Sequence, residues 1–171
     1  MKKDKVSKIV TTTVADRPAR KLLLLRSKKA ICYDTFCAEV GCEWHGILNS
    51  VPEKFDTCAI ITLPPYLVKE RTSDIAGGVE VPYDYAEGLP QGYELIDLPA
   101  CKMMYFQGMP FENERDYGEA IGTVWSAKSS YKPELYGYQY AYDAAPQFNF
   151  GAEAATGAKI AVPVVCCKKD V

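Results

Sequence analysis

One carboxylate and one run of tyrosines are the residues of this sequence best suited to bind a small molecule. Glu80 lies between Val79 and Val81 in "GGVEVP", and tyrosines alternate with other residues in "YGYQYAY" (residues 136–142). Side chains alternate between the two faces of a strand, so strands here would place Glu80 opposite its valines and all four phenols on one face. A fixed carboxylate beside aromatic rings attracts cationic or hydrogen-bond-donating ligands.

Both features also have a purely structural interpretation. Tyrosine favours strands and packs well against helices, while a glutamate in a strand can simply face solvent. Four phenols on one face are harder to bury, because each buried hydroxyl requires a hydrogen-bond partner. We therefore expect some of these rings to border open space.

Catalytic and metal-binding motifs are weakly represented. The single histidine, His45, follows Trp44 in a predicted helix, and the sequence contains neither a GxSxG motif nor a nucleotide-binding glycine loop. Cys37, Cys42 and His45 would scatter around a helix rather than converge as zinc ligands do. The seven cysteines are an odd number, which favours reduced thiols over a disulfide framework. We expect no catalytic residue, no metal and no cofactor, so that binding is favoured over bond-breaking.

The composition is that of one ordinary globular domain. The 171 residues are 48% hydrophobic and 25% charged, with a net charge of −2. No stretch concentrates Lys and Arg as a nucleic-acid-binding face does, and apolar runs such as residues 22–25 are far shorter than the ~20 residues of a membrane span. The basic N-terminus continues with threonines instead of a hydrophobic signal core. We therefore predict a cytoplasmic protein without direct nucleic-acid or membrane contacts.

Two amphipathic helices and several strands must position these residues. Apolar periodicity predicts helices at residues 36–51 and 113–129. Short apolar segments bounded by Pro, Gly or Asp predict strands, at residues 19–35, 59–63, 75–82, 93–107, 136–142 and 158–165. The resulting order is β-α-β-β, twice over.

The two halves also match each other in sequence. Trp44 and Trp125 lie 81 residues apart, and "VEVP" at residues 79–82 precedes "IAVP" at residues 160–163 by the same 81 residues. We predict a single α+β domain over residues 1–171, an antiparallel sheet with two main helices, built from duplicated units at about 17–82 and 93–165. Pseudo-twofold symmetry would leave a groove where the units meet. Ala161 corresponds to Glu80 in the second unit, so only one half offers a carboxylate.

Several segments, in this order, are similar to a known family of ligand-binding domains. They are "GCEWHGILNSVPEKFDTCAIITLPPYLVKERTSDIAGGVEVP", "GYELIDLPACKMMYFQGMPFENERDYGEAIGTVW", "YKPELYGYQYA", "APQFNFGA" and "TGAKIAVPV". Together they resemble the effector-binding domain attached to many AraC-type bacterial transcription regulators, a member of the GyrI-like (gyrase-inhibitor-like) group, from about residue 17 to 165. The resemblance implies two β-α-β-β (SHS2-type) units around a pseudo-twofold groove that binds small molecules, often lipophilic or cationic ones.

Three departures from the family pattern modify what the resemblance implies. Many relatives have an acidic residue within the aromatic stretch, where this chain has Gln139. Relatives that resemble small hydrolases have a further glutamate in the last strand, where this chain has Ile160, which counts against general acid–base catalysis. Only about sixteen residues precede Arg17, so we do not expect the helix-turn-helix reader of the regulators.

We predict a stand-alone effector-binding module, regulatory or sequestering in role, that captures an aromatic, amphipathic or cationic molecule. The predicted lining of its groove is Tyr33, Trp44, Glu80, Tyr105, Trp125, Tyr138, Gln139 and Tyr140. The tryptophans would form opposite walls, the tyrosines would supply ring faces and hydroxyls, and Glu80 with Gln139 would set the polarity. Two alternatives stay open: a GyrI-like small-molecule hydrolase, and an inhibitor whose outer surface binds a protein partner such as gyrase.

Overall fold

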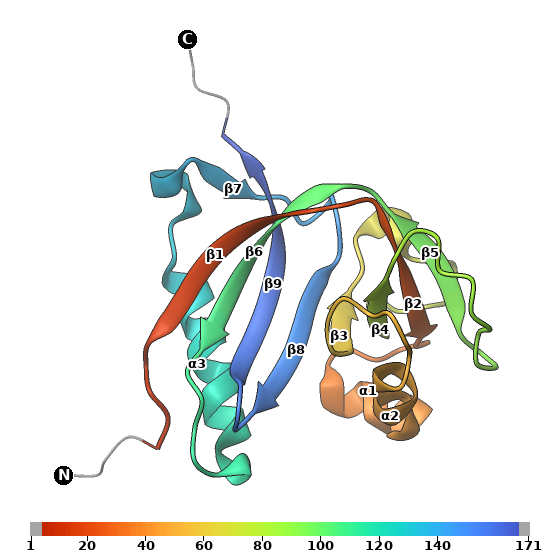
Figure 1. Cartoon of the computed structure of the whole chain (residues 1–171), viewed down its shortest axis with the longest axis horizontal. Helices are drawn as coiled ribbons and strands as arrows, with labels where there is room; N and C mark the ends of the chain where they lie inside the picture. Colours follow the sequence, from red (N-terminus) through yellow and green to blue (C-terminus); the bar gives the residue numbers. More distant parts are fainter. Residues whose placement is uncertain (1–4, 168–171) are drawn as a thin grey trace.

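Nine strands pair into one antiparallel sheet in the computed structural model of the chain, which describes residues 5–167 (Figure 1). The strands are β1 (Val10–Arg17), β2 (Arg20–Arg26), β3 (Ala59–Thr62), β4 (Ile75–Val81), β5 (Glu94–Leu98), β6 (Cys101–Gly108), β7 (Tyr138–Tyr140), β8 (Gln147–Glu153) and β9 (Gly157–Cys166). Eight of them follow the order β1-β6-β9-β8-β3-β4-β2-β5, and β7 pairs with the end of β9.

Three α-helices accompany the sheet. They are α1 (Tyr33–Val40), α2 (Glu43–Asn49) and α3 (Tyr117–Ser130), and short 3-10 turns lie at Pro65–Leu67, Glu114–Asp116 and Pro133–Tyr136. Gly41 separates α1 from α2 with φ of +86°, a left-handed conformation that glycine adopts without strain. No helix in the described part of the chain is long and apolar enough to cross a membrane.

The strand order is symmetric about the β8–β3 pair, which confirms the predicted fold class. From β6 to β2 the sheet runs β6-β9-β8 and then β3-β4-β2, so each strand of one repeat has a counterpart in the other. The first repeat is β2, α1 and α2, β3, β4, and the second is β6, α3, β8, β9. Glu80 and Ala161 do not occupy equivalent positions in the register, because Glu80 pairs with Leu22 near the end of β4, whereas Ala161 lies between Tyr105 of β6 and Phe148 of β8.

The two repeats exchange their preceding strands, and this exchange bends the sheet. β1 leads into β2 but pairs with β6, and β5 leads into β6 but pairs with β2. In a flat sheet β1 and β2 would lie about 29 Å apart, six strand spacings of ~4.8 Å. Three Cα–Cα steps from Arg17 to Arg20 span at most ~11 Å, so the sheet must curl until its edges approach. Figure 1 shows both connections running close together across the top of the view.

Three apolar clusters follow from this curvature. Each repeat has its own cluster beneath its helices, formed around Phe36 and Leu48 in the first and around Phe106 and Val124 in the second. A third cluster contains strand residues from both repeats, among them Leu22, Ile61 and Met103, and no residue of an α-helix. The third cluster therefore fills the concave face of the sheet, while the helices cover the convex face.

Several predicted boundaries are wrong. The strand predicted at 19–35 ends at Arg26, and Tyr33 begins α1. The helix predicted at 36–51 is two short helices, and the strand predicted at 93–107 is interrupted at Pro99. The strands β1 and β8 were not predicted. Only residues 138–140 of the tyrosine run form a strand, because Tyr136 closes a 3-10 turn and Gly137 has φ of +85°.

Candidate functional site

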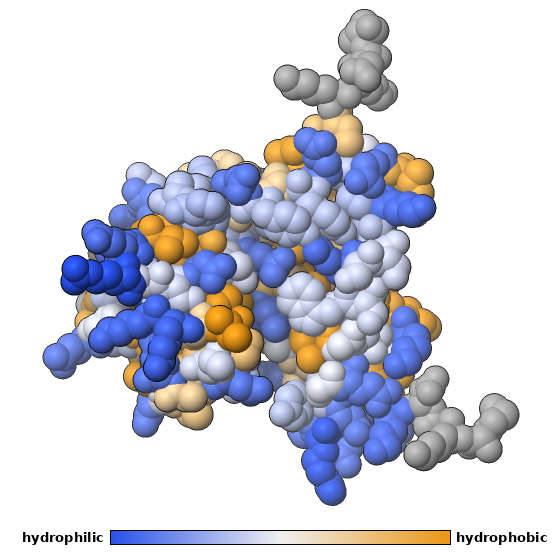
Figure 2. Space-filling model, turned by 180° about the vertical axis from the view of Figure 1, so that it is seen from behind, coloured by the Kyte–Doolittle hydropathy of each residue, from blue (hydrophilic) through white to orange (hydrophobic). Residues whose placement is uncertain are grey.

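The convex face carries a surface between the helices of the two repeats, which we call the interhelical surface. The α3 residues Ala120 and Val124 are buried against the sheet, and Glu119, Thr123 and Ser126 face the segment that precedes β1. Helical spacing places Tyr117, Ile121, Trp125 and Lys128 on the remaining side, toward β7 and β8. Seen from behind, the molecule is hollowed between its two halves (Figure 2).

The first repeat contributes Tyr33 to this surface and places Trp44 beneath it. The two rings meet edge to face at 6.4 Å, and Trp44 also meets Phe36 at 5.2 Å. Trp44 is only 3% exposed, so it supports the surface without presenting a ring, whereas Tyr33 is 51% exposed. Burial raises the pKa of Tyr33 to about 12, with smaller contributions from neighbours that include Tyr117 of α3. Tyr33 is therefore the ring that the first repeat presents on this surface.

The floor between the helices is the seam where β3 of one repeat pairs with β8 of the other. Ile60 pairs with Asn149, and Thr62 pairs with Gln147. Ile60 belongs to the apolar cluster beneath α1 and α2, so these pairs face the convex side, since directly opposed residues share a face. Asn149 and Gln147 are half-buried. The floor is therefore polar and uncharged.

Lys128 occupies the aromatic surface that the tyrosine run provides. Its Nζ lies 4.8 Å from the ring centre of Tyr140 and 4.9 Å from that of Tyr142, and it donates a hydrogen bond to the Tyr142 hydroxyl. The Tyr140 hydroxyl donates to the Lys128 carbonyl, and burial raises the pKa of Tyr140 to about 12. Tyr136 instead stacks on Tyr131 at 5.3 Å. The four phenols thus do not form one stripe.

Glu80 lies on the opposite, concave face and is neutralised by two arginines. It is 4% exposed, and its Oε2 accepts from Arg20 Nε and from Arg17 Nη2, the latter at 3.4 Å. Arg20 is fully buried, and its Nη1 also donates to the carbonyls of Pro18 and Pro99, which lie in the two crossing connections. Burial alone would lower the pKa of Arg20, and the charge of Glu80 raises it above its ordinary value. This cluster ties the two repeats together.

The remaining predicted residues divide between the two faces. Tyr105 shares the concave face with Glu80, where burial raises its pKa and the charge of Arg17 acts in the opposite direction. Gln139 is exposed, and Tyr138 packs against the cluster beneath α3. The structure thus brings Tyr33 and Trp44 together in the first repeat, packs Trp125 and Tyr140 against the cluster beneath α3 in the second, and leaves Glu80, Tyr105 and Gln139 apart from both pairs.

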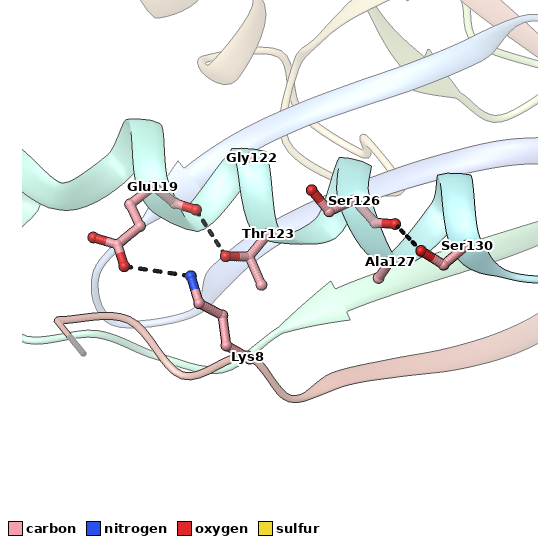
Figure 3. Close-up of a pocket in the computed structure, with 7 residues that line it drawn as sticks. All are labelled: Lys8, Glu119, Gly122, Thr123, Ser126, Ala127 and Ser130. Atoms are coloured by element: carbon pink, nitrogen blue, oxygen red, sulfur yellow. Dashed lines mark hydrogen bonds and ion pairs between the residues drawn. The ribbon is translucent and has the colours of Figure 1, made fainter. Parts of the chain in front are cut away.

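Two further surface hollows lie away from these residues. One, of about 600 Å³, lies between α3 and the segment before β1, where Lys8 forms an ion pair with Glu119 (Figure 3). Thr123 and Ser130 donate their hydroxyl hydrogens to carbonyls of their own helix, so neither donor is available to a ligand. The other, of about 470 Å³, lies beside α1 at Glu39, whose carboxylate accepts backbone N–H groups of residues 28 and 29.

The interhelical surface has the chemistry of a binding site. It offers aromatic rings, two amides and one ammonium group. Within residues 5–167, no group of three His, Cys, Asp or Glu side chains is arranged to hold a metal ion. His45 lies on the exposed side of α2 and contacts Asn49, another residue of that helix.

Sequence reasoning missed residues on both faces. Lys128 gives no motif, because its partners Tyr140 and Tyr142 are set by the packing of α3 against β7. Arg17 and Arg20 flank "PA" in the connection between β1 and β2. The one sequence signal for an internal partner of Glu80 is the arginine at the start of the apolar run "RKLLLL", because such a run is expected to be buried.

Comparisons with known proteins bear on the fold. No protein-family model matches the chain, and no curated protein matches it either. Among solved structures, SAV2435 bound to tetraphenylphosphonium is similar over 91% of this chain and 94% of its own, with 13% identity and a TM-score of 0.56. A Staphylococcus aureus MU50 protein, provisionally assigned to bacterial transcription regulation, is similar over 90% and 97%, with 12% identity and a TM-score of 0.51. These likenesses show a shared fold.

Proposed function

We propose that this chain is a small-molecule-binding module whose ligand is aromatic and occupies the interhelical surface. The observation that carries the proposal is that each repeat has an aromatic cluster with an exposed tyrosine, Tyr33 with Trp44 in the first and Tyr142 with Tyr140 in the second, while the molecule is hollowed between its two halves (Figure 2). Concave sites lined by aromatic side chains with a few polar groups are the usual form of small-molecule sites.

The fold comparison supports the same proposal. SAV2435, which shares this fold, was solved bound to tetraphenylphosphonium, an organic cation that carries four phenyl rings. The family resemblance of the sequence points in the same direction, toward an effector-binding role in regulation or sequestration. The ligand of this chain need not share the charge of that compound, because the two sequences are only 13% identical.

The proposal is tested by ligand capture and by one matched pair of variants. Native mass spectrometry of freshly purified full-length protein should detect a bound small molecule, and isothermal titration should detect binding of naphthalene derivatives. Tyr33→Ala should weaken binding roughly two- to tenfold, the range expected from the loss of one aromatic contact. Tyr33 is 51% exposed, so its removal should leave the fold intact.

Tyr83→Ala is the control, because Tyr83 is a similarly exposed tyrosine, 57%, that follows β4 and lies against Lys21. It should bind as the unmodified protein does. Equal loss of affinity in both variants would show that the interhelical surface is not the site. If the purified protein retains no small molecule and binds none of the naphthalene derivatives, the proposal itself is refuted.

A further inference from the structure

We infer that the interhelical surface selects a small aromatic carboxylate rather than a lipophilic cation, and that Lys128 is the residue that binds the carboxylate. This inference rests on the ligand-binding function proposed above. Three observations support it. Lys128 has no carboxylate partner, its ammonium group already lies over the tyrosine rings, and Glu80 lies on the opposite face of the sheet.

Lys128 is a half-buried ammonium group with unused hydrogen-bond donors. Of its three N–H groups, one is used by the Tyr142 hydroxyl. Across residues 5–167 it takes part in no ion pair, whereas the half-buried lysines Lys21, Lys102 and Lys159 each have a carboxylate partner and Lys54 donates to a backbone carbonyl. An ammonium group that is partly removed from water and lacks a counter-ion favours an anion beside it.

The ring surface that would attract a cationic ligand is already occupied. Lys128 Nζ is within 5 Å of the ring centres of both Tyr140 and Tyr142, which is the position a bound cation would take. A second positive charge in the same place would be repelled by the ammonium group. This arrangement disfavours cations.

Among residues 5–167, no carboxylate forms an ion pair with Lys128. Glu80 lies on the concave face and is held by Arg17 and Arg20. Glu134, in the turn after α3, is close enough to affect the pKa of Tyr140 but is exposed and forms no ion pair with Lys128. The amides of Asn149 and Gln147 on the floor are neutral.

The neighbouring side chains fit the aromatic part of such a ligand. Trp125 lies one helical turn before Lys128 on the same side of α3 and is half-buried. A carboxylate bound to Lys128 would therefore place an attached ring beside the Trp125 indole.

The test compares three probes that share one ring system: 2-naphthoate, neutral 2-naphthamide and the 2-naphthylmethylammonium cation, each titrated into the full chain. We expect naphthoate to bind at least about tenfold more tightly than the ammonium probe, as charge-assisted hydrogen bonds allow. Lys128→Gln should remove that preference and leave naphthamide affinity within about threefold. Lys128→Arg should retain the preference, because it keeps the charge and the donors.

Lys8→Gln is the matched control, since it removes one positive charge from the opposite side of α3. It should leave all three affinities unchanged, and thermal denaturation of each variant checks the fold. Equal or tighter binding of the ammonium probe, or a carboxylate preference that survives Lys128→Gln, would overturn this inference while leaving the proposed function in place. Failure of all three probes to bind would instead overturn the proposed function and this inference with it.

Discussion

Glu80→Gln should destabilise the protein more than any other single loss of charge, because the Glu80 cluster is buried where the two crossing connections meet. Arg20 is 0% exposed and Glu80 4% exposed, so the substitution leaves a buried guanidinium without its counter-ion. Breaking a buried ion pair in this way costs about 3–5 kcal/mol. Arg17→Gln should cost less than about 1 kcal/mol, because the Arg17 side chain remains 19% exposed and its contact is 3.4 Å long.

Urea unfolding measures both values, with an unchanged dependence on denaturant concentration as evidence that the folded and unfolded states are otherwise the same. The double variant Arg20→Met/Glu80→Leu should be more stable than Glu80→Gln, since it leaves no uncompensated buried charge. Recovery should be incomplete, because the carbonyls of Pro18 and Pro99 lose their donor. A loss below 1 kcal/mol for Glu80→Gln, or an equal loss for Arg17→Gln, would refute the view that this pair is buried and structural.

Two further predictions concern packing and pH. Gly77→Ala should lower the free energy of unfolding by about 1–3 kcal/mol in urea, because a Cβ there would lie 2.7 Å from the Trp44 ring. Gly46→Ala, which has open space around it, should be neutral or stabilising. Equal effects of the two substitutions would contradict the packing of Trp44 on β4. Tyr140 has its pKa raised from 10.0 to about 12 by burial, so its contribution to stability is complete below pH 10 and is lost as the pH rises toward 12. Tyr140→Phe should reduce this alkaline loss, measured as stability against pH, and remove one tyrosine that ionises late in an ultraviolet titration; an unchanged titration would contradict the burial of that hydroxyl.

The periodicity of the sequence was sufficient for the elements that depend on local patterns. The helix α3 and the strand containing "GGVEVP" lie close to where they were predicted, because the apolar spacing of each matches only one type of secondary structure. The helix break at Gly41 and the separate strands β5 and β6 also have local causes, a left-handed glycine and Pro99, and could have been predicted more closely.

The candidate site was only partly predictable. Alternation correctly placed Glu80 on the face opposite Val79 and Val81. The sequence could not show that this second face is also buried, because the curvature that closes it depends on the exchange of β1 and β5 between repeats. The same is true of Lys128, whose aromatic partners are 12 and 14 residues further along the chain and meet it only after α3 has packed on the sheet.

The sequence by itself therefore determined the duplicated α+β architecture, the amphipathic helices and the abundance of aromatic rings, since these follow from patterns within each repeat. Only the tertiary structure decided which charges are available to a ligand. Glu80 pairs with Arg17 and Arg20, and Lys128 lies over two tyrosine rings, only because folding brings together segments that are distant in the sequence. Electrostatic attraction depends on distance in space and not on distance along the chain.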